Sequence, residues 1–144
     1  MKRVVCLIFL ALTASSVHAA TITKEQVVGA WVSQDPVGFK SRIIHWLAEP
    51  TPARLEISKD LAVTFTRHFK DGQQVLKADP SMVSFDDDLM TIKFPKTDQG
   101  LELKLVLSGW SIAAGKRLFG QLYLYDKDGL FNGMSVSFEP EHGS

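Results

Sequence analysis

The strongest constraint on the fold is a repeated alternation of apolar and polar residues in short runs. In the segment 101–107 every odd position is leucine, and the same period of two recurs in 61–66, 90–94, 122–124 and 134–138. A period of two places apolar side chains on one face of a β-strand and polar side chains on the other. The chain is therefore predicted to fold into half-buried strands.

The connections between these runs are short. They are segments 58–60, 70–72, 86–88, 98–100 and 127–129, and two of them contain an Asp-Gly pair. Asp-Gly favours tight hairpin turns, whereas parallel strands need crossovers of about a dozen residues. We therefore expect about eight to ten antiparallel strands. In 74–85, Pro80 either divides one long strand or separates two.

An up-and-down sheet of this size with one apolar face closes most readily into a barrel, which also removes its edges. Thr23 followed by Gln26 is a capping-box pattern, so residues 23–28 are predicted to form a short helix before the first strand. The predicted fold is all-β: an antiparallel up-and-down meander closing into a barrel, with a short N-terminal helix. No internal linker is apparent, so residues 20–144 are expected to form a single domain.

The alternation also predicts which side chains point into the barrel. They are Leu55, Ile57, Leu61, Val63, Phe65, Met90, Ile92, Phe94, Leu103, Leu105, Leu122, Leu124, Met134, Val136 and Phe138. These residues either line a ligand cavity or fill the interior, since a barrel of about eight strands permits both. Phe119, Tyr123 and Tyr125 fall on the opposite face of their strand. They form either an external recognition stripe or a surface covered by the N-terminal segment.

Residues 1–19 have the pattern of a secretory signal peptide. Met1-Lys2-Arg3 is basic, residues 4–14 are almost entirely apolar, and Val17-His18-Ala19 fits a cleavage site. The apolar run is shorter than the roughly 20 residues of a spanning helix, so no stable membrane insertion is expected. The mature chain is expected to be periplasmic or secreted. It would contain no cysteine, because Cys6 lies in the signal.

Charge and composition argue against several classes of function. The chain has 16 basic and 16 acidic residues and no basic stripe, so nucleic-acid binding is not expected. His45, His68 and His142 lack metal-ligand spacing, the acidic turns lack a complete calcium-loop pattern, and no metal or other cofactor is expected. No Gly-x-Ser-x-Gly elbow or catalytic cysteine is present. No catalytic residue is assigned, and the chain is not expected to be an enzyme.

A predicted short helix leads into Val28-Gly29-Ala30-Trp31-Val32. This segment resembles the Gly-x-Trp motif of lipocalins and related calycins. The resemblance implies a lipocalin-like barrel in which Trp31 closes one end and packs against a basic residue, for which Lys116 and Arg117 are the candidates. It also implies carriage of a small hydrophobic molecule. The disulfide and C-terminal helix usual in that family are missing, and the chain is closer in size to compact periplasmic barrels such as lysozyme inhibitors.

Two functional hypotheses follow. In the first, an exported lipocalin-like barrel binds a small hydrophobic or amphipathic molecule. Its candidate ligand-binding residues are aromatic or aliphatic: Trp31, Phe39, Trp46, Phe65, Leu105 and Trp110. In the second, the chain is a periplasmic protein-binding inhibitor or immunity-type protein. It would act through the Ser- and Gly-containing loop 108–116 with Trp110 as anchor, or through the outward aromatic residues.

Overall fold

The computed structural model describes residues 21–36, 52–69, 72–98, 100–112 and 115–142. In these parts of the chain it contains a short helix, a 3-10 turn and nine strands. They are α1 (Lys24–Val27), β1 (Gly29–Pro36), β2 (Pro52–Ile57), β3 (Val63–Phe69), β4 (Gly72–Ala78), η1 (Pro80–Met82), β5 (Val83–Asp86), β6 (Leu89–Lys93), β7 (Glu102–Ile112), β8 (Gly115–Asp126) and β9 (Gly129–Pro140).

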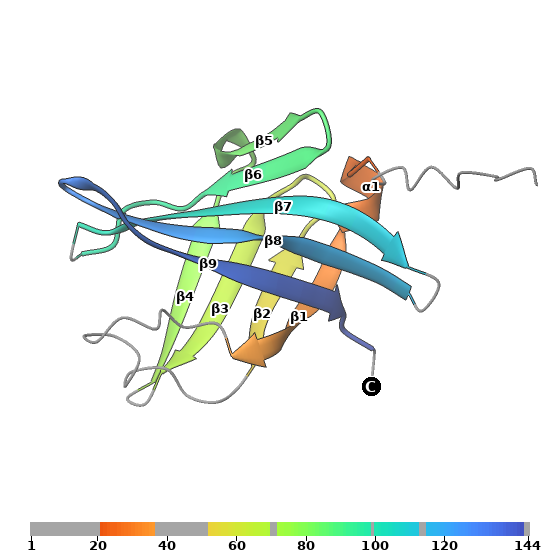
Figure 1. The fold of residues 1–144 in the computed structure, drawn as a ribbon, viewed down its shortest axis with the longest axis horizontal. Coiled ribbons are helices and arrows are strands. Elements are labelled where there is room, and N and C mark those ends of the chain that lie inside the picture. Colours follow the sequence, from red (N-terminus) through yellow and green to blue (C-terminus); the bar gives the residue numbers. More distant parts are fainter. Residues whose placement is uncertain (1–20, 37–51, 70–71, 99, 113–114, 143–144) are drawn as a thin grey trace, which may run out of the picture.

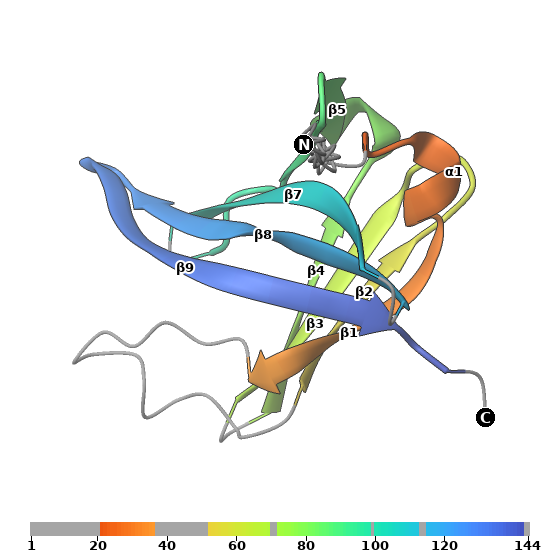
Figure 2. The ribbon, with the colours of Figure 1, turned by 45° about the vertical axis from the view of Figure 1, so that its right-hand side comes forward.

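The strands form one antiparallel sheet in the order β4-β3-β2-β1-β9-β8-β7-β6-β5. Strands β7, β8 and β9 cross in front of β1–β4 (Figure 1), and a second view shows how the sheet curls between the two groups (Figure 2). The result is a nearly closed barrel, so the predicted all-β antiparallel meander with a short N-terminal helix is confirmed.

The barrel closes through β1 and β9, which are far apart in sequence. Their register pairs Trp31 with Pro140 and Ser33 with Phe138. Strands β4 and β5 are consecutive in sequence but lie at opposite ends of the strand order. Between them Pro80 opens the turn η1, where the fixed φ of proline suits a helical turn and its missing N–H cannot extend a ladder. Pro80 therefore separates two strands, and the sheet ends there.

The core matches the predicted inward set closely. All but two of those residues are buried, and the exceptions, Leu61 and Met134, pack partly buried against the core. Phe65 lies at its centre, with its ring centroid 5.9 Å from that of Phe94 and 6.3 Å from that of Phe138. The prediction that Leu61 belongs to a strand was wrong. Its φ of 71° places it in a turn, and β3 begins at Val63.

Helix α1 is joined to the first strand by a tryptophan. The backbone N–H of Thr23 donates a hydrogen bond to Gln26 Oε1 at 3.0 Å, which caps the helix as the sequence predicted. Trp31 is buried, and its indole N–H donates to the carbonyl of Val27 at 2.8 Å. The chain turns from helix to strand at Gly29, whose φ of 138° is accessible to glycine at little cost.

Residues 108–112 and 115–116 of the predicted loop lie in strands, which corrects the sequence prediction. Strand β7 continues to Ile112 and β8 begins at Gly115, with Ser108 paired to Phe119 and Ile112 to Gly115. Serine and glycine favour turns but do not forbid strands, and pairing with β8 satisfies the backbone here. The segment is therefore the end of a β-hairpin.

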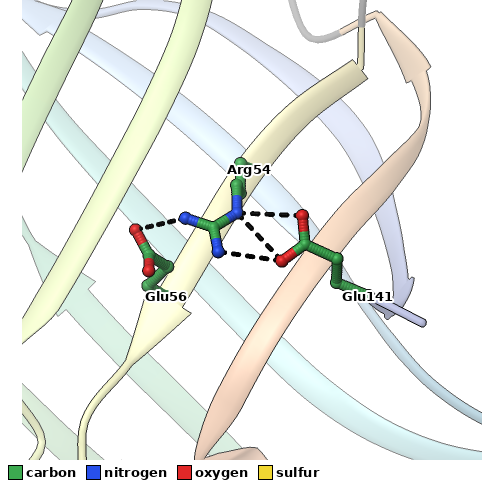
Figure 3. Close-up of polar contacts among 3 residues, drawn as sticks. All are labelled: Arg54, Glu56 and Glu141. Carbon is green, nitrogen blue, oxygen red and sulfur yellow. Dashed lines mark hydrogen bonds and ion pairs between the residues drawn. The ribbon is translucent and has the colours of Figure 1, made fainter. Parts of the chain in front are cut away.

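A cluster of charged side chains links β2 to the chain after β9 (Figure 3). Arg54 on β2 donates to both carboxylate oxygens of Glu141, at 3.0 and 2.8 Å, and its other terminal nitrogen lies 2.6 Å from Glu56 Oε2. The backbone N–H of Glu141 donates to the carbonyl of Ala30 on β1 at 2.8 Å. Hydrogen bonding to Arg54 holds the pKa of the Glu141 carboxyl below its usual value. Arg54 thus reaches across β1 and holds the chain that follows β9.

The predicted signal peptide lies outside the described residues, as do the candidate ligand-binding residues Phe39 and Trp46. In the part of the chain that the structure describes, no helix has the length and hydropathy needed to cross a bilayer.

We predict that Arg54→Met lowers the melting temperature at pH 7 by a few degrees at most, because exposed ion pairs are screened by solvent. The folded-state pKa of Glu141 is depressed, so its contribution is complete above the ordinary value of 4.5 and is lost as pH falls through the folded-state pKa. Thermal melts from pH 7 to pH 3 should therefore show the two proteins converging in acid. Lys127→Met, which removes an exposed cation from the β8–β9 turn, is the control. A difference that persists at pH 3 would show that Arg54 acts through packing rather than charge.

Candidate functional site

The predicted interior residues form part of one packed core. Phe65 and Leu105 are fully buried, and Trp31 is 4% exposed. All three belong to the same hydrophobic cluster, in which inward side chains from both halves of the sheet meet. The backbone of Trp110 lies in β7, opposite Arg117 of β8. Arg117 lies 3.9 Å from the carboxylate of Glu139 on β9. The members of the predicted ligand set that the structure describes are therefore divided between the barrel interior and the end of a hairpin.

A buried arginine, Arg67, is not among the predicted site residues. Arg67 follows Val63 and Phe65 on the inward face of β3 and is only 5% exposed. Its guanidinium donates a hydrogen bond to Gln74 on β4, and burial lowers its pKa to about 10. Arg67 lies two residues after Phe65, so the period of two puts its side chain on the inward face. Its burial could therefore have been predicted from the alternation. Arg67 lies toward the end of the barrel that is farther from α1.

The outer face of β6–β9 differs from the rest of the surface because its centre carries no charge. The outward residues there are apolar, aromatic or hydroxyl- or amide-bearing: Leu89, Thr91, Val106, Ser108, Phe119, Gln121, Tyr123, Ser135 and Ser137. We call this set the uncharged face. Charged residues border this face, at Lys93 and Lys104 on one side, where Lys104 pairs with Tyr123, and at Arg117 and Glu139 on the other.

A groove of about 330 Å³ lies on the uncharged face. Its walls are mainly apolar and include Leu89, which is 44% exposed, together with Val106 and Phe119. Hydroxyl and amide groups lie beside these walls. Gln121 Nε2 donates to Ser135 Oγ at 2.9 Å, and Ser108 Oγ donates to the carbonyl of Phe119 at 3.2 Å. The groove can therefore accept an apolar group while offering hydrogen-bonding groups around it.

Gly120 lies at the floor of this groove and allows β8 to approach β7 closely. A Cβ atom at this position would lie 2.1 Å from the backbone carbonyl oxygen of Val106 and 3.0 Å from a methyl carbon of Leu107. No other residue fits without moving backbone. The close approach of the two strands, and with it the form of the groove, depends on this glycine.

Aromatic side chains continue from the uncharged face toward the β8–β9 turn at Tyr123 and Tyr125, which pair with Lys104 and Glu102 of β7. Tyr123 lies opposite Gly133, where a Cβ atom would come 3.3 Å from the tyrosine ring. The ring thus covers a strand position that has no side chain of its own. Tyr125 follows, with its ring centroid 6.4 Å from that of Tyr123. Tyr123, Tyr125 and Phe119 point away from the buried leucines of β8, as the sequence predicted.

The outer face of β1–β4 has the opposite character. It carries Arg54, Glu56, His68 and Lys77 among threonines. A groove of about 340 Å³ on this side runs past Glu56 and Ser58. Because charged groups are costly to bury without a partner, this face suits contact with solvent.

Sequence reasoning could have found part of the uncharged face. Val106 occupies an outward position among the leucines of β7, so it breaks the alternation with an apolar residue where a polar one is expected. Leu89 does the same one position before the buried Met90. The groove itself depends on the pairing of β6, β7 and β8, which the sequence does not reveal. Comparisons with protein families, with curated proteins and with solved structures found no match to this chain.

We predict that Gly120→Ala destabilises the fold by about 3 kcal/mol, because the new methyl group would overlap a backbone carbonyl that cannot move independently. Gly133→Ala is the matched control on the neighbouring strand. Its Cβ would meet only the side chain of Tyr123, so we expect a loss of no more than about 1 kcal/mol. Urea unfolding of the three proteins measures both. Equal losses would show that the approach of β8 to β7 is not as tight as described.

Proposed function

We propose that this chain is an exported protein-binding module whose partner docks on the uncharged face of β6–β9. The observation that carries the proposal is the pattern on that face: an apolar groove, aromatic side chains and neutral polar groups at the centre, with charged residues only at the margins. Protein interfaces have this composition, with few charges and more aromatic residues at the core and a polar rim. An inhibitor or immunity-type role requires a binding surface and no chemistry.

The groove also indicates which partner surface would fit. An apolar side chain of the partner would lie between Leu89, Val106 and Phe119. Neutral hydrogen-bonding groups of the partner would meet Ser108, Gln121 and Ser135. A charge at the centre of the partner surface would be buried without an opposite charge and would weaken binding by several kcal/mol. The N-terminal signal pattern supports a partner in the same exported compartment.

The test is a pair of aspartate substitutions on the two outer faces. Val106→Asp places a charge at the groove, and Thr64→Asp places one on the outer face of β3. Capture from an envelope extract identifies a stoichiometric partner, and titration calorimetry with that purified partner measures affinity. We expect Val106→Asp to weaken binding by about 30-fold or more, as for an interface hot spot, and Thr64→Asp to bind as wild type.

Circular dichroism melts establish that both variants fold. If a folded Val106→Asp protein binds the partner with unchanged affinity, the partner does not use the uncharged face. If no stoichiometric partner is captured by the wild-type protein from the compartment to which it is exported, the proposed function is wrong.

A second proposal is carriage of a small amphipathic molecule in a lipocalin-like barrel, as the Gly-x-Trp resemblance implies. The observation that favours it is the buried guanidinium of Arg67 beside Gln74 on the inward side of the sheet. A cation in such a position would orient the acidic end of an amphipathic ligand. On this proposal Trp31, Phe65 and Leu105 would contact its apolar part.

Native mass spectrometry of protein purified from its own envelope fraction tests this second proposal. A retained small mass that is released on denaturation, and that is lost in Arg67→Met, is the expected result. Gln121→Met, an outward substitution on β8, should retain the mass. A wild-type protein with no bound mass would refute carriage.

A further inference from the structure

The break between β4 and β5 leaves the sheet with two ends, and β4 is the longer of the two end strands. In the part of the chain that the structure describes, β4 pairs with β3 alone. An end strand presents a row of backbone N–H and C=O groups that can template another strand. The outward side chain at its centre is Val75, which is 44% exposed.

The register shows which backbone groups of β4 face outward from the sheet. Phe69 pairs with Gly72 across a two-residue connection, and such a closing pair exchanges hydrogen bonds. Bonded and non-bonded pairs then alternate along an antiparallel ladder. Residues 72, 74, 76 and 78 therefore bond to β3. Gln73, Val75 and Lys77 direct their N–H and C=O groups toward the open edge.

This open edge is complementary to itself. A two-fold axis at Val75 sets Val75 opposite Val75 of a second copy and Gln73 opposite Lys77. Every outward N–H and C=O of the three residues then has a partner in a bonded pair. In this register Lys77 of each copy faces the neutral amide of Gln73 in the other copy. A two-fold axis at Lys77 would instead set Lys77 against Lys77, which is repulsive.

The other end of the sheet lacks these properties. Strand β5 has four residues, and the same alternation leaves only Val83 and Phe85 with groups facing outward. The acidic residues Asp86, Asp87 and Asp88 follow directly. A second copy paired there would place at most Val83 and Phe85 of each strand in bonded pairs. Self-pairing is therefore favoured at β4.

We propose that two copies of this chain associate through their β4 strands, antiparallel and with the two-fold axis at Val75, to form a closed dimer whose sheet is continuous across the interface. A two-fold contact uses the same surface on both copies and does not propagate into a filament. One strand pair buries less than the roughly 1,200 Å² of a standard interface, so the dimer is weak and depends on protein concentration.

Disulfide trapping in the full chain with Cys6→Ser tests the register directly. Paired Cα atoms in a bonded antiparallel pair lie about 5.5 Å apart, within disulfide range. Val75→Cys should therefore cross-link to a dimer on mild oxidation. Gln73→Cys alone should not, because its copies lie about four residues apart along the strand, roughly 13 Å. A mixture of Gln73→Cys and Lys77→Cys proteins should cross-link.

Sedimentation velocity from about 5 µM to 1 mM protein, a range chosen for a weak interface, tests association without cysteines. The wild-type chain should shift from monomer to dimer, as should Gln121→Lys on the outer face of β8, whose partners Val106 and Ser135 are uncharged. Val75→Lys, which sets lysine against lysine, should remain monomeric, as should Val75→Pro, which removes an outward N–H but no bond to β3. A wild-type monomer at 1 mM, a dimer insensitive to both Val75 substitutions, or equal cross-linking of Val75→Cys and Gln73→Cys would overturn the proposal.

Discussion

The pairing of β1 with β9 is the constraint on which the barrel depends. Every other strand pair in the described structure joins neighbours in sequence, so each can form as a local hairpin. The β1–β9 pair joins residues 31–33 to residues 138–140 and must overcome the entropy of closing nearly the whole chain. Among the described residues, only three pairs join β1 to β9, and contacts of two side chains, one on β1 and one on β2, stabilise this short pairing. Trp31 buries its ring and bonds to α1, and Arg54 holds Glu141 across β1.

Closure at this point determines where the sheet must end. A meander closed by its first and last strands would have no edge if β4 and β5 also paired, but η1 at Pro80 separates them. The two edges, β4 and β5, therefore lie in the middle of the sequence. Edge strands are a common source of association between chains. The self-complementary register of β4 is thus a consequence of the same closure that builds the core.

The sequence predicted the fold class and nearly all of the core, because a period of two is a local property that survives into the structure. It did not predict properties that depend on pairing. Leu61 fits the alternation but lies in a turn. The pairing of β2 with β3 ends at Ile57 and Val63, so the residues between them connect the two strands. The segment 108–116 has the composition of a loop, yet β7 extends to Ile112 and pairs with β8 from Gly115. Val106 was visible as a break in the alternation, whereas its groove depends on Gly120 and on the neighbouring strands.

The uncharged face and the β4 edge are built from different strands, since β3, β2 and β1 separate β4 from β9 on one side and β5 separates it from β6 on the other. The two surfaces therefore share no residue. A dimer formed through β4 would carry two uncharged faces at a fixed separation. A partner with two matching sites would bind the second as an intramolecular event, which raises its apparent affinity without any new contact. A weak edge interface would then be strengthened by such a partner, because anything that binds only the paired state shifts the equilibrium toward it.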